Sequence, residues 1–313
     1  MTTRTMVIAL GGNALAPATE RGTIQDQFRH TRESLATVVG LAREGWRLAI
    51  VHGNGPQVGD ALVQQEMARG AVPPLPLGVL VAATQGWIGY MIQQSLQNAL
   101  AHAGVEREVV TLVTQTIVDP ADPSLSEPSK PVGRTLDEET SSRLAAELGW
   151  RMAPSGSGWR RVVASPAPLR IVERETIRAL VADGHIVIAA GGGGAPVYPH
   201  PTLGLEGMDA VVDKDRAAAV LARDLGAEVL LILTDVDAVF ADYGTPAERR
   251  IGKLTIAEAE ALLGTEALGA GSMRPKVEAA AQFVREGGTR AVIASLHDAT
   301  HAVAGEAGTS ITA

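Results

Sequence analysis

Short apolar runs that end in glycine-rich or polar turns recur along this chain, and they restrict its fold more than any other feature. The clearest runs are residues 5–10, 47–51, 185–190 and 227–233. Each run is too short for a helix and largely apolar, a pattern typical of strands buried in a parallel sheet. Because parallel strands need long crossovers, usually helices, between them, the pattern predicts an α/β fold.

The segments between these runs have the apolar spacing of helices that cover a sheet. Helices are predicted over about 23–43, 173–183, 217–222, 255–263 and 272–285. Further strands are predicted at 109–113 and 290–295, with a final edge strand at 308–312. The alternation of strands and helices therefore extends over nearly the whole chain.

This alternation stops at one place, near Asp119. The following stretch is dense in proline and polar residues, and the rhythm resumes only after Val172. Excursions of this length often serve as lids over an active site. We predict a lid at about 119–166 inserted in a single domain that spans 1–313.

The charge balance limits the partners of the chain. Its net charge is −8, from 27 Lys and Arg against 35 Asp and Glu, and it has no basic block. This composition argues against nucleic acid or an anionic membrane as a partner. The absence of cysteine excludes disulfides and thiolate catalysis, and the lack of a signal-peptide pattern after Met1 favours a cytoplasmic setting.

One long segment, 71–105, contains no Asp, Glu, Lys or Arg. Prolines break its first part, and glutamines such as Gln93 and Gln94 would find no partners in a bilayer. Apolar residues then fall close to helical spacing at Val79, Leu80, Ala83, Trp87, Met91 and Leu96. We predict a long helix in the core or at a subunit interface, and we expect a homodimer.

Three of the apolar runs lead into glycine-rich loops that suit anion binding. These loops begin with Gly11-Gly12-Asn13, with Gly53-Asn54 and with the four glycines at 191–194. Glycines let backbone N–H groups approach an anion, and open α/β sheets place ligands at the carboxyl ends of strands. Each loop alone could equally be a tight turn, and none matches a dinucleotide or P-loop motif. We expect His52 to bond to backbone rather than to act as a catalyst.

A lysine lies between two carboxylates in Asp213-Lys214-Asp215, just before an alanine-rich helix. Alone, this triplet is explained by a solvated helix start that Asp213 or Asp215 caps. Lys130 lies among prolines, however, and Lys276 lies in the first turn of a helix, where a cation is unfavourable. Lysines neutralise a transferring phosphoryl group, glycine amides bind its oxygens, and aspartates such as Asp235 hold lysines or recruit Mg²⁺. The combination predicts a kinase of a small anionic acceptor.

Eight motifs in this order resemble those of the carbamate kinases, within the amino acid kinase family. They are the segments 9–15, 52–59, 85–90, 129–133, 160–163, 191–197, 213–215 and 271–277. The likeness spans the chain from Val7 to Thr309. It implies an α/β fold, an open three-layer αβα sandwich with a mostly parallel central sheet and a small protruding subdomain. It also implies an acceptor side in the N-terminal part and a nucleotide side at about 186–313.

The resemblance implies a reversible reaction in which ATP and carbamate give ADP and carbamoyl phosphate, with Mg²⁺ bound through the nucleotide phosphates and no metal ligand from the protein. It implies ATP formation during arginine catabolism. Lys214 is expected to stabilise the transition state, with Asp215 orienting the lysines. The other implied contacts are Gly11, Gly12 and Asn13 at the transferring phosphoryl group, Gly53 and Asn54 at carbamate, Lys130 and Lys276 at the nucleotide phosphates, and Thr234, Asp235, Tyr243, Met273, Gly192 and Gly193 near the nucleotide.

The lid departs from the family pattern in two places. No acidic residue stands shortly before Arg160, and Ser124 stands where an aromatic residue is common. One alternative is therefore a related kinase for another small carboxylate, phosphonate or phosphate acceptor. An alternative of a different class is a non-catalytic regulator that binds a nucleotide or metabolite. The three lysines argue against this regulator, because a pure binder needs no transition-state stabilisation.

Overall fold

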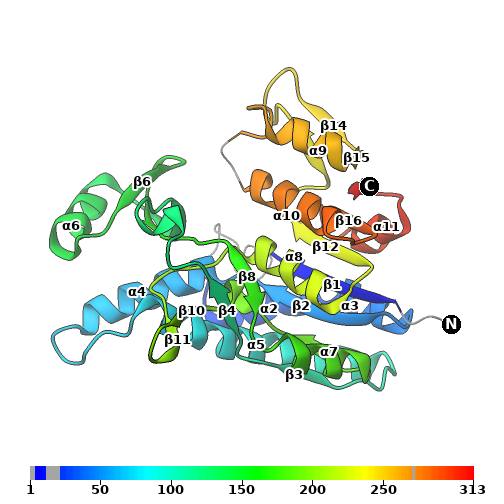
Figure 1. Cartoon of the computed structure of the whole chain (residues 1–313), viewed down its shortest axis with the longest axis horizontal. Helices are drawn as coiled ribbons and strands as arrows, with labels where there is room; N and C mark the ends of the chain where they lie inside the picture. The colour runs from blue at the N-terminus through cyan, green and yellow to red at the C-terminus, as the bar shows by residue number, and fades with distance from the viewer. Residues whose placement is uncertain (1–3, 12–21, 270–271) are drawn as a thin grey trace.

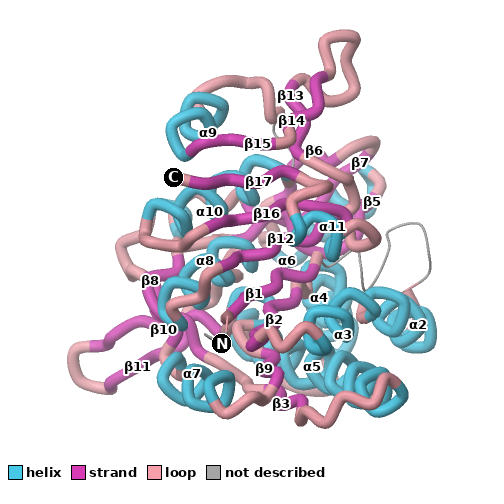
Figure 2. Tube along the Cα trace, turned by 90° about the vertical axis from the view of Figure 1, so that its right-hand side faces the viewer, coloured by secondary structure: helices cyan, strands magenta, loops and turns pink. Residues whose placement is uncertain are grey.

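The computed structural model describes residues 4–11, 22–269 and 272–313 (Figure 1). Its centre is an eight-stranded sheet in the order β15-β17-β16-β12-β1-β2-β9-β3, which Figure 2 shows from top to bottom. The strands are β1 (Thr5–Leu10), β2 (Arg47–His52), β3 (Val109–Thr111), β9 (Ile186–Ile188), β12 (Val229–Thr234), β15 (Lys253–Thr255), β16 (Arg290–Ser295) and β17 (Thr309–Thr312). All neighbours in this sheet are parallel except β16 and β17.

The two faces of the central sheet form two separate cores. Along β1, Val7 and Ala9 belong to one core, whereas Met6, Ile8 and Leu10 belong to the other, as the period of a strand requires. One face is covered by α7 (Arg174–Ala182), α8 (Lys214–Leu225), α9 (Ile256–Leu263) and α10 (Met273–Arg285). The other is covered by α3 (Ala36–Arg43), α5 (Leu77–His102) and α11 (Ala299–Ala304) (Figure 2). The arrangement is the predicted three-layer sandwich.

A small antiparallel sheet, in the order β5-β7-β6, projects away from the central sheet (Figure 1). It consists of β5 (Lys130–Leu136), β6 (Met152–Ser155) and β7 (Gly158–Val163), with α6 (Glu138–Leu148) inserted after β5. It rests on α4 (Gly55–Ala68), where Gly59 and Gly133 make a close backbone contact. We call this unit, residues 130–163, the lid sheet.

Smaller elements complete the body. A four-stranded sheet joins β11 (Gly204–Gly207), β10 (Ala195–His200), β4 (Gln115–Val118) and β8 (Pro168–Ile171). A two-stranded ribbon joins β13 (Val239–Ala241) and β14 (Arg249–Ile251), and two 3₁₀ turns are η1 (Pro123–Leu125) and η2 (Gly191–Gly193). The remaining helix, α2 (Ile24–Ser34), brings Phe28 edge-on against Tyr90 of α5.

The structure corrects three of the predicted elements. The helix predicted at 23–43 is two helices that meet at the buried residue Leu35, whose N–H donates to the Arg32 carbonyl, three residues back, and so breaks the α-helical pattern. The strand predicted at 109–113 ends at Thr111, and β4 begins separately at Gln115. The final strand, β17, is not an edge strand, because the short strand β15 pairs with its outer side.

Helix α5 accounts for the long uncharged segment. Leu80, Met91 and Leu96 are buried in the protein, whereas Val79 and Trp87 are 48% and 43% exposed. The helix therefore packs into the core on one side only. Over the residues with a described placement, no helix has both the length and the apolar character needed to cross a membrane.

Candidate active site

A cavity of about 270 Å³ opens where the parallel strands of the central sheet end. Four strand ends and their following loops line it, as expected for an open α/β sheet. They contribute Gly11 after β1, Gly53 and Asn54 after β2, Gly192 after β9, and Thr234 and Asp235 at the end of β12. Apart from Asp235, the charged side chains come from the lid sheet and from the starts of α8 and α10.

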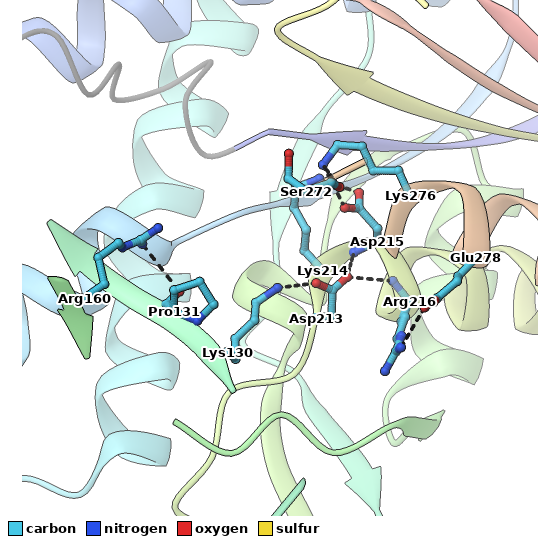
Figure 3. Close-up of polar contacts among 10 residues, drawn as sticks. All are labelled: Lys130, Pro131, Arg160, Asp213, Lys214, Asp215, Arg216, Ser272, Lys276 and Glu278. Atoms are coloured by element: carbon cyan, nitrogen blue, oxygen red, sulfur yellow. Dashed lines mark hydrogen bonds and ion pairs between the residues drawn. The ribbon is translucent and has the colours of Figure 1, made fainter. Parts of the chain in front are cut away.

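Three lysines meet two buried carboxylates in this cavity (Figure 3). Lys130 Nζ pairs with Asp213 Oδ2. Lys214 Nζ lies 2.6 Å from Asp215 Oδ1, and Lys276 Nζ lies 3.4 Å from Asp215 Oδ2. The lysines come from the lid sheet, α8 and α10, so segments far apart in the sequence bring their charges together.

The three lysines and two aspartates of this cluster influence one another's pKa values. Burial disfavours the ionised carboxyl of Asp213, but Lys130 and Lys214 outweigh burial and hold its pKa well below the usual range. Burial lowers the pKa of the Lys214 ammonium, and the charge of Asp215 opposes that lowering. With Arg160 and Asp235, which also line the cavity, four cations face three anions, so the cavity attracts a further anion.

Asp213 has two tasks at once. Its Oδ1 accepts hydrogen bonds from the backbone N–H groups of Asp215, at 2.9 Å, and Arg216, at 3.2 Å. This is the N-cap of α8, as the sequence predicted, and it leaves Oδ2 for Lys130. The helix start and the lysine of the lid sheet therefore share one carboxylate.

Lys276 lies in the first turn of α10, where the sequence placed it. Its Nζ donates to the Ser272 carbonyl at 3.2 Å, and its side chain is nearly buried. A cation at a helix N-terminus is unfavourable by itself. Asp215 supplies the compensating anion, so Lys276 is held in place before any ligand arrives.

Packing between protein segments accounts for part of the glycine run in η2. A Cβ on Gly191 would lie 2.2 Å from His52 Nε2, and one on Gly192, which has φ +62, would lie 2.2 Å from Asn54 Nδ2. Close packing on the end of β2 and on the loop that follows it therefore requires Gly191 and Gly192. Of the run 191–194, only Gly192 lines the cavity.

His52, the last residue of β2, is buried and lies against Gly191 of this glycine run. Its Nδ1 lies 3.0 Å from the carbonyl oxygen of Gly53, which confirms the predicted bond to backbone. Burial lowers its pKa to about 4, and the Gly53 carbonyl opposes this effect only partly. His52 is therefore neutral at pH 7 and supports the loop.

The predicted site residues fall into three groups. The cavity is lined by Gly11, Gly53, Asn54, Lys130, Gly192, Lys214, Asp215, Thr234, Asp235 and Lys276. Outside its lining lie Gly193, which is buried against Val212; Met273, which packs on a core; and Tyr243, which is 65% exposed beside Phe240. Gly12 and Asn13 lie outside the described residues.

Sequence reasoning missed part of the cavity lining. The missed residues are Gly55, Pro56, Pro131, Val132, Arg160, Val211, Val212, Ser272 and Pro275. Arg160 is the charged member of this set. Its signal was the Arg160-Arg161 pair in a short strand, since neighbouring residues of a strand point to opposite faces.

Comparison with known proteins gives consistent results. Residues 4–295 match the amino acid kinase family. A carbamate kinase of Pyrococcus horikoshii is 46% identical over 310 residues, which cover 98% of each chain. A carbamate kinase of Escherichia coli is 45% identical over 308 residues, which cover 98% of this chain and 99% of the other.

Solved structures show the same architecture. A carbamate kinase from Giardia lamblia bound to citric acid aligns with a TM-score of 0.94 at 38% identity, over 99% of both chains. A structure of a carbamate kinase from the same organism bound to AMP-PNP aligns with a TM-score of 0.90 at 39% identity, again over 99% of both. These likenesses confirm the predicted fold class.

Proposed function

This chain belongs to the amino acid kinase family, and we propose that its reaction is that of a carbamate kinase. A phosphoryl group passes reversibly between ATP and carbamate, giving ADP and carbamoyl phosphate. The observation that carries this proposal is the cluster of Lys130, Lys214 and Lys276 on two buried aspartates at the strand ends. The similarity to carbamate kinases over nearly the whole chain supports the choice of acceptor.

Phosphoryl transfer depends on positioning and on neutralising charge, and it needs little covalent help from the protein. In the direction that forms ATP, a β-phosphate oxygen of ADP forms a new bond to phosphorus. The bond between phosphorus and the carbamate oxygen breaks, and that oxygen leaves as part of a carboxylate. No proton is needed at the leaving oxygen, so the main task of the protein is to stabilise the charge of the transferring group.

Lys214 is the residue to which we assign this task. Its ammonium is nearly buried and is held 2.6 Å from Asp215, so it needs little rearrangement as the reaction proceeds. Asp215 also orients Lys276, and Asp213 orients Lys130. We assign these two outer lysines to the nucleotide phosphates.

The two ends of the cavity have different partners in this proposal. Gly11, Gly53 and Asn54 belong to the acceptor end, in the N-terminal part. Thr234, Asp235 and Lys276 belong to the nucleotide end, in the part that begins at about 186. Residues 119–166 serve as the lid over both ends, which the position of Lys130 on the lid sheet supports.

Mg²⁺ fits this site as a companion of the nucleotide. Of the carboxylates that line the cavity, Asp213 and Asp215 are already engaged by lysines. Asp235, the third carboxylate of the lining, is a single side chain, so we assign the oxygens that Mg²⁺ requires mainly to the nucleotide phosphates. When bound there, the ion supplies further neutralisation of phosphate charge.

The setting and assembly are also proposals. The resemblance favours a cytoplasmic enzyme that makes ATP in arginine catabolism and works as a homodimer. The exposed apolar side chains of α5, Val79, Trp87 and Tyr90, support a surface for a second copy. Light scattering after size exclusion measures the assembly, and a monomeric mass at working concentration contradicts it.

The function is tested by ATP formation from ADP and carbamoyl phosphate, with Lys214→Ala beside the wild type. Removal of one preorganised donor lowers kcat by about 10²–10³-fold. Lys253→Ala is the matched control, because Lys253 is exposed and lies outside this cavity.

The outcomes separate the alternatives. If the wild type makes no ATP from carbamoyl phosphate but transfers the phosphoryl group of ATP to another small carboxylate, phosphonate or phosphate, the related kinase is right. If nucleotide binds but no acceptor is phosphorylated, the non-catalytic regulator is right. Activity that survives in Lys214→Ala contradicts the mechanism while leaving the reaction in place.

A further inference from the structure

Arg160 brings a further cation from the lid sheet into the cavity at the strand ends. It lies on β7 and lines the same cavity as Gly53, Asn54 and Lys130, and Figure 3 shows it beside Pro131. The proposed mechanism assigns no role to Arg160.

The guanidinium of Arg160 lacks the partners that neighbouring cations have. Its Nε is buried without a hydrogen-bond partner, and its Nη2 makes only a long contact, 3.4 Å, with the Pro131 carbonyl. Within the described ranges no carboxylate lies at ion-pair distance from it, whereas Lys130 has Asp213 and Arg216 has Glu278. A buried donor without an acceptor costs free energy, and such groups in folded proteins call for an explanation.

The surroundings of Arg160 suit an anion. Burial lowers the pKa of the guanidinium, which means that desolvation is not offset by any nearby negative charge. The same cavity is lined by Gly55, where α4 begins without a side-chain cap, while the Nδ2 group of the N-cap residue Asn54 donates to Thr84 Oγ1 at 2.8 Å. The N-terminus of α4 and Arg160 therefore present positive potential to the same volume.

We propose that Arg160 binds the acceptor substrate through two oxygens of its carboxylate or phosphate group, opposite the start of α4. This inference rests on the proposed function and adds a substrate-binding residue to it. A planar guanidinium matches two oxygens of a carboxylate or phosphate, which an ammonium does not. Arg160 thus selects acceptors that carry a carboxylate or a phosphate group. It also links binding of the acceptor to the position of the lid sheet.

The neighbouring residue provides a matched control. Arg161 lies on the opposite face of β7, with its guanidinium 4.2 Å from the centre of the Trp150 ring. It lines a separate cavity beside α4 and not the one at the strand ends. Arg161→Gln removes the same charge from the same strand of the lid sheet without removing a group from the acceptor end.

The experiment compares Arg160→Gln, Arg160→Lys and Arg161→Gln with the wild type. It measures the KM values for carbamoyl phosphate and ADP, and the affinity for carbamoyl phosphate by calorimetry without nucleotide. A lost charge-assisted pair of hydrogen bonds raises the carbamoyl phosphate KM and Kd of Arg160→Gln by about 10- to 100-fold. Its ADP KM stays within about two-fold, Arg160→Lys is intermediate, and Arg161→Gln matches the wild type.

Other results overturn the inference. If the wild type turns over and Arg160→Gln changes neither the KM nor the Kd for carbamoyl phosphate, Arg160 does not bind the acceptor, although the proposed function stands. If the wild type makes no ATP, the proposed function fails. Calorimetry with inorganic phosphate then tests whether Arg160 binds an anion. Weaker phosphate binding in Arg160→Gln alone retains the inference, and equal binding in all variants overturns it. Should Arg160→Gln not fold, an unchanged carbamoyl phosphate KM in Arg160→Lys overturns it.

Discussion

The contact between Gly59 and Gly133 holds the lid sheet on the body, and Gly59→Ala perturbs it directly. Gly59 lies in α4, and Gly133 lies in β5, three residues after Lys130. A Cβ on Gly59 would lie 1.9 Å from Gly133 Cα and 2.4 Å from Gly133 N. Carbon atoms in contact prefer about 3.5–4.0 Å, so the two backbones must separate by roughly 1.6–2.1 Å.

This separation reaches the cavity, because β5 carries Lys130 and pairs with β7, which carries Arg160. Misplacing a reacting group by about 1 Å can cost about 10²-fold in rate. We therefore expect Gly59→Ala to lower kcat by about 100-fold or more. Overpacking also lowers the free energy of unfolding by about 1–3 kcal/mol.

The assay is ATP formation together with urea unfolding, and Gly40→Ala in α3 is the control. A Cβ on Gly40 would meet only Thr300 Oγ1 at 4.0 Å, an ordinary contact. This helix substitution is expected to raise stability by up to about 1 kcal/mol and to leave kcat unchanged. If Gly59→Ala retains the wild-type kcat, the contact with α4 does not position Lys130, and the reasoning is refuted.

Three further predictions concern the loop after β2 and the nucleotide end. Because the pKa of His52 falls from 6.5 to about 4 on folding, its contribution is complete above pH 6.5 and is lost as the pH falls toward 4. Urea unfolding at pH 7 and 4.5 should show roughly 2–3 kcal/mol more loss in the wild type than in His52→Gln, and equal losses would contradict a neutral buried imidazole. Gly192→Ala puts a Cβ 2.2 Å from Asn54 Nδ2 and should raise the carbamoyl phosphate KM about tenfold; a normal KM would show that Asn54 can move without loss. Lys276→Met should raise the ADP KM about tenfold or more. A rise in the carbamoyl phosphate KM alone would contradict the assignment of Lys276 to the nucleotide end.

Most of the architecture follows from short-range sequence patterns. The runs that became β1, β2 and β12 are apolar except at their ends, which indicated burial between two helix layers. By contrast, β15 has only Lys253, Leu254 and Thr255, of which two are exposed. Its place in the sheet depends on pairing with β17, a long-range contact that no local pattern encodes.

The site was predictable to the same extent. The lysines could be identified, because Lys276 violates a local electrostatic rule that only a nearby anion explains. The direction of a side chain from a strand or loop was harder to infer. Gly191 packs on His52 instead of a ligand, and Arg160 faces the cavity because of the register between β5 and β7. Such facts depend on what lies across from a residue after folding.

The position of β1 in the middle of the sheet has a consequence for how activity arises during folding. Met6 of β1 pairs with Leu48 of β2 nearby in the sequence, but also with Val229 of β12. Closing the second pairing joins segments separated by most of the chain, which is entropically costly and slow. We call the β1–β12 pairing the seam: the cavity takes Gly11 from the strand on one side of it and Thr234 from the strand on the other. Recovery of phosphoryl transfer during refolding therefore reports the closure of the seam, whereas helix formation reports much earlier events.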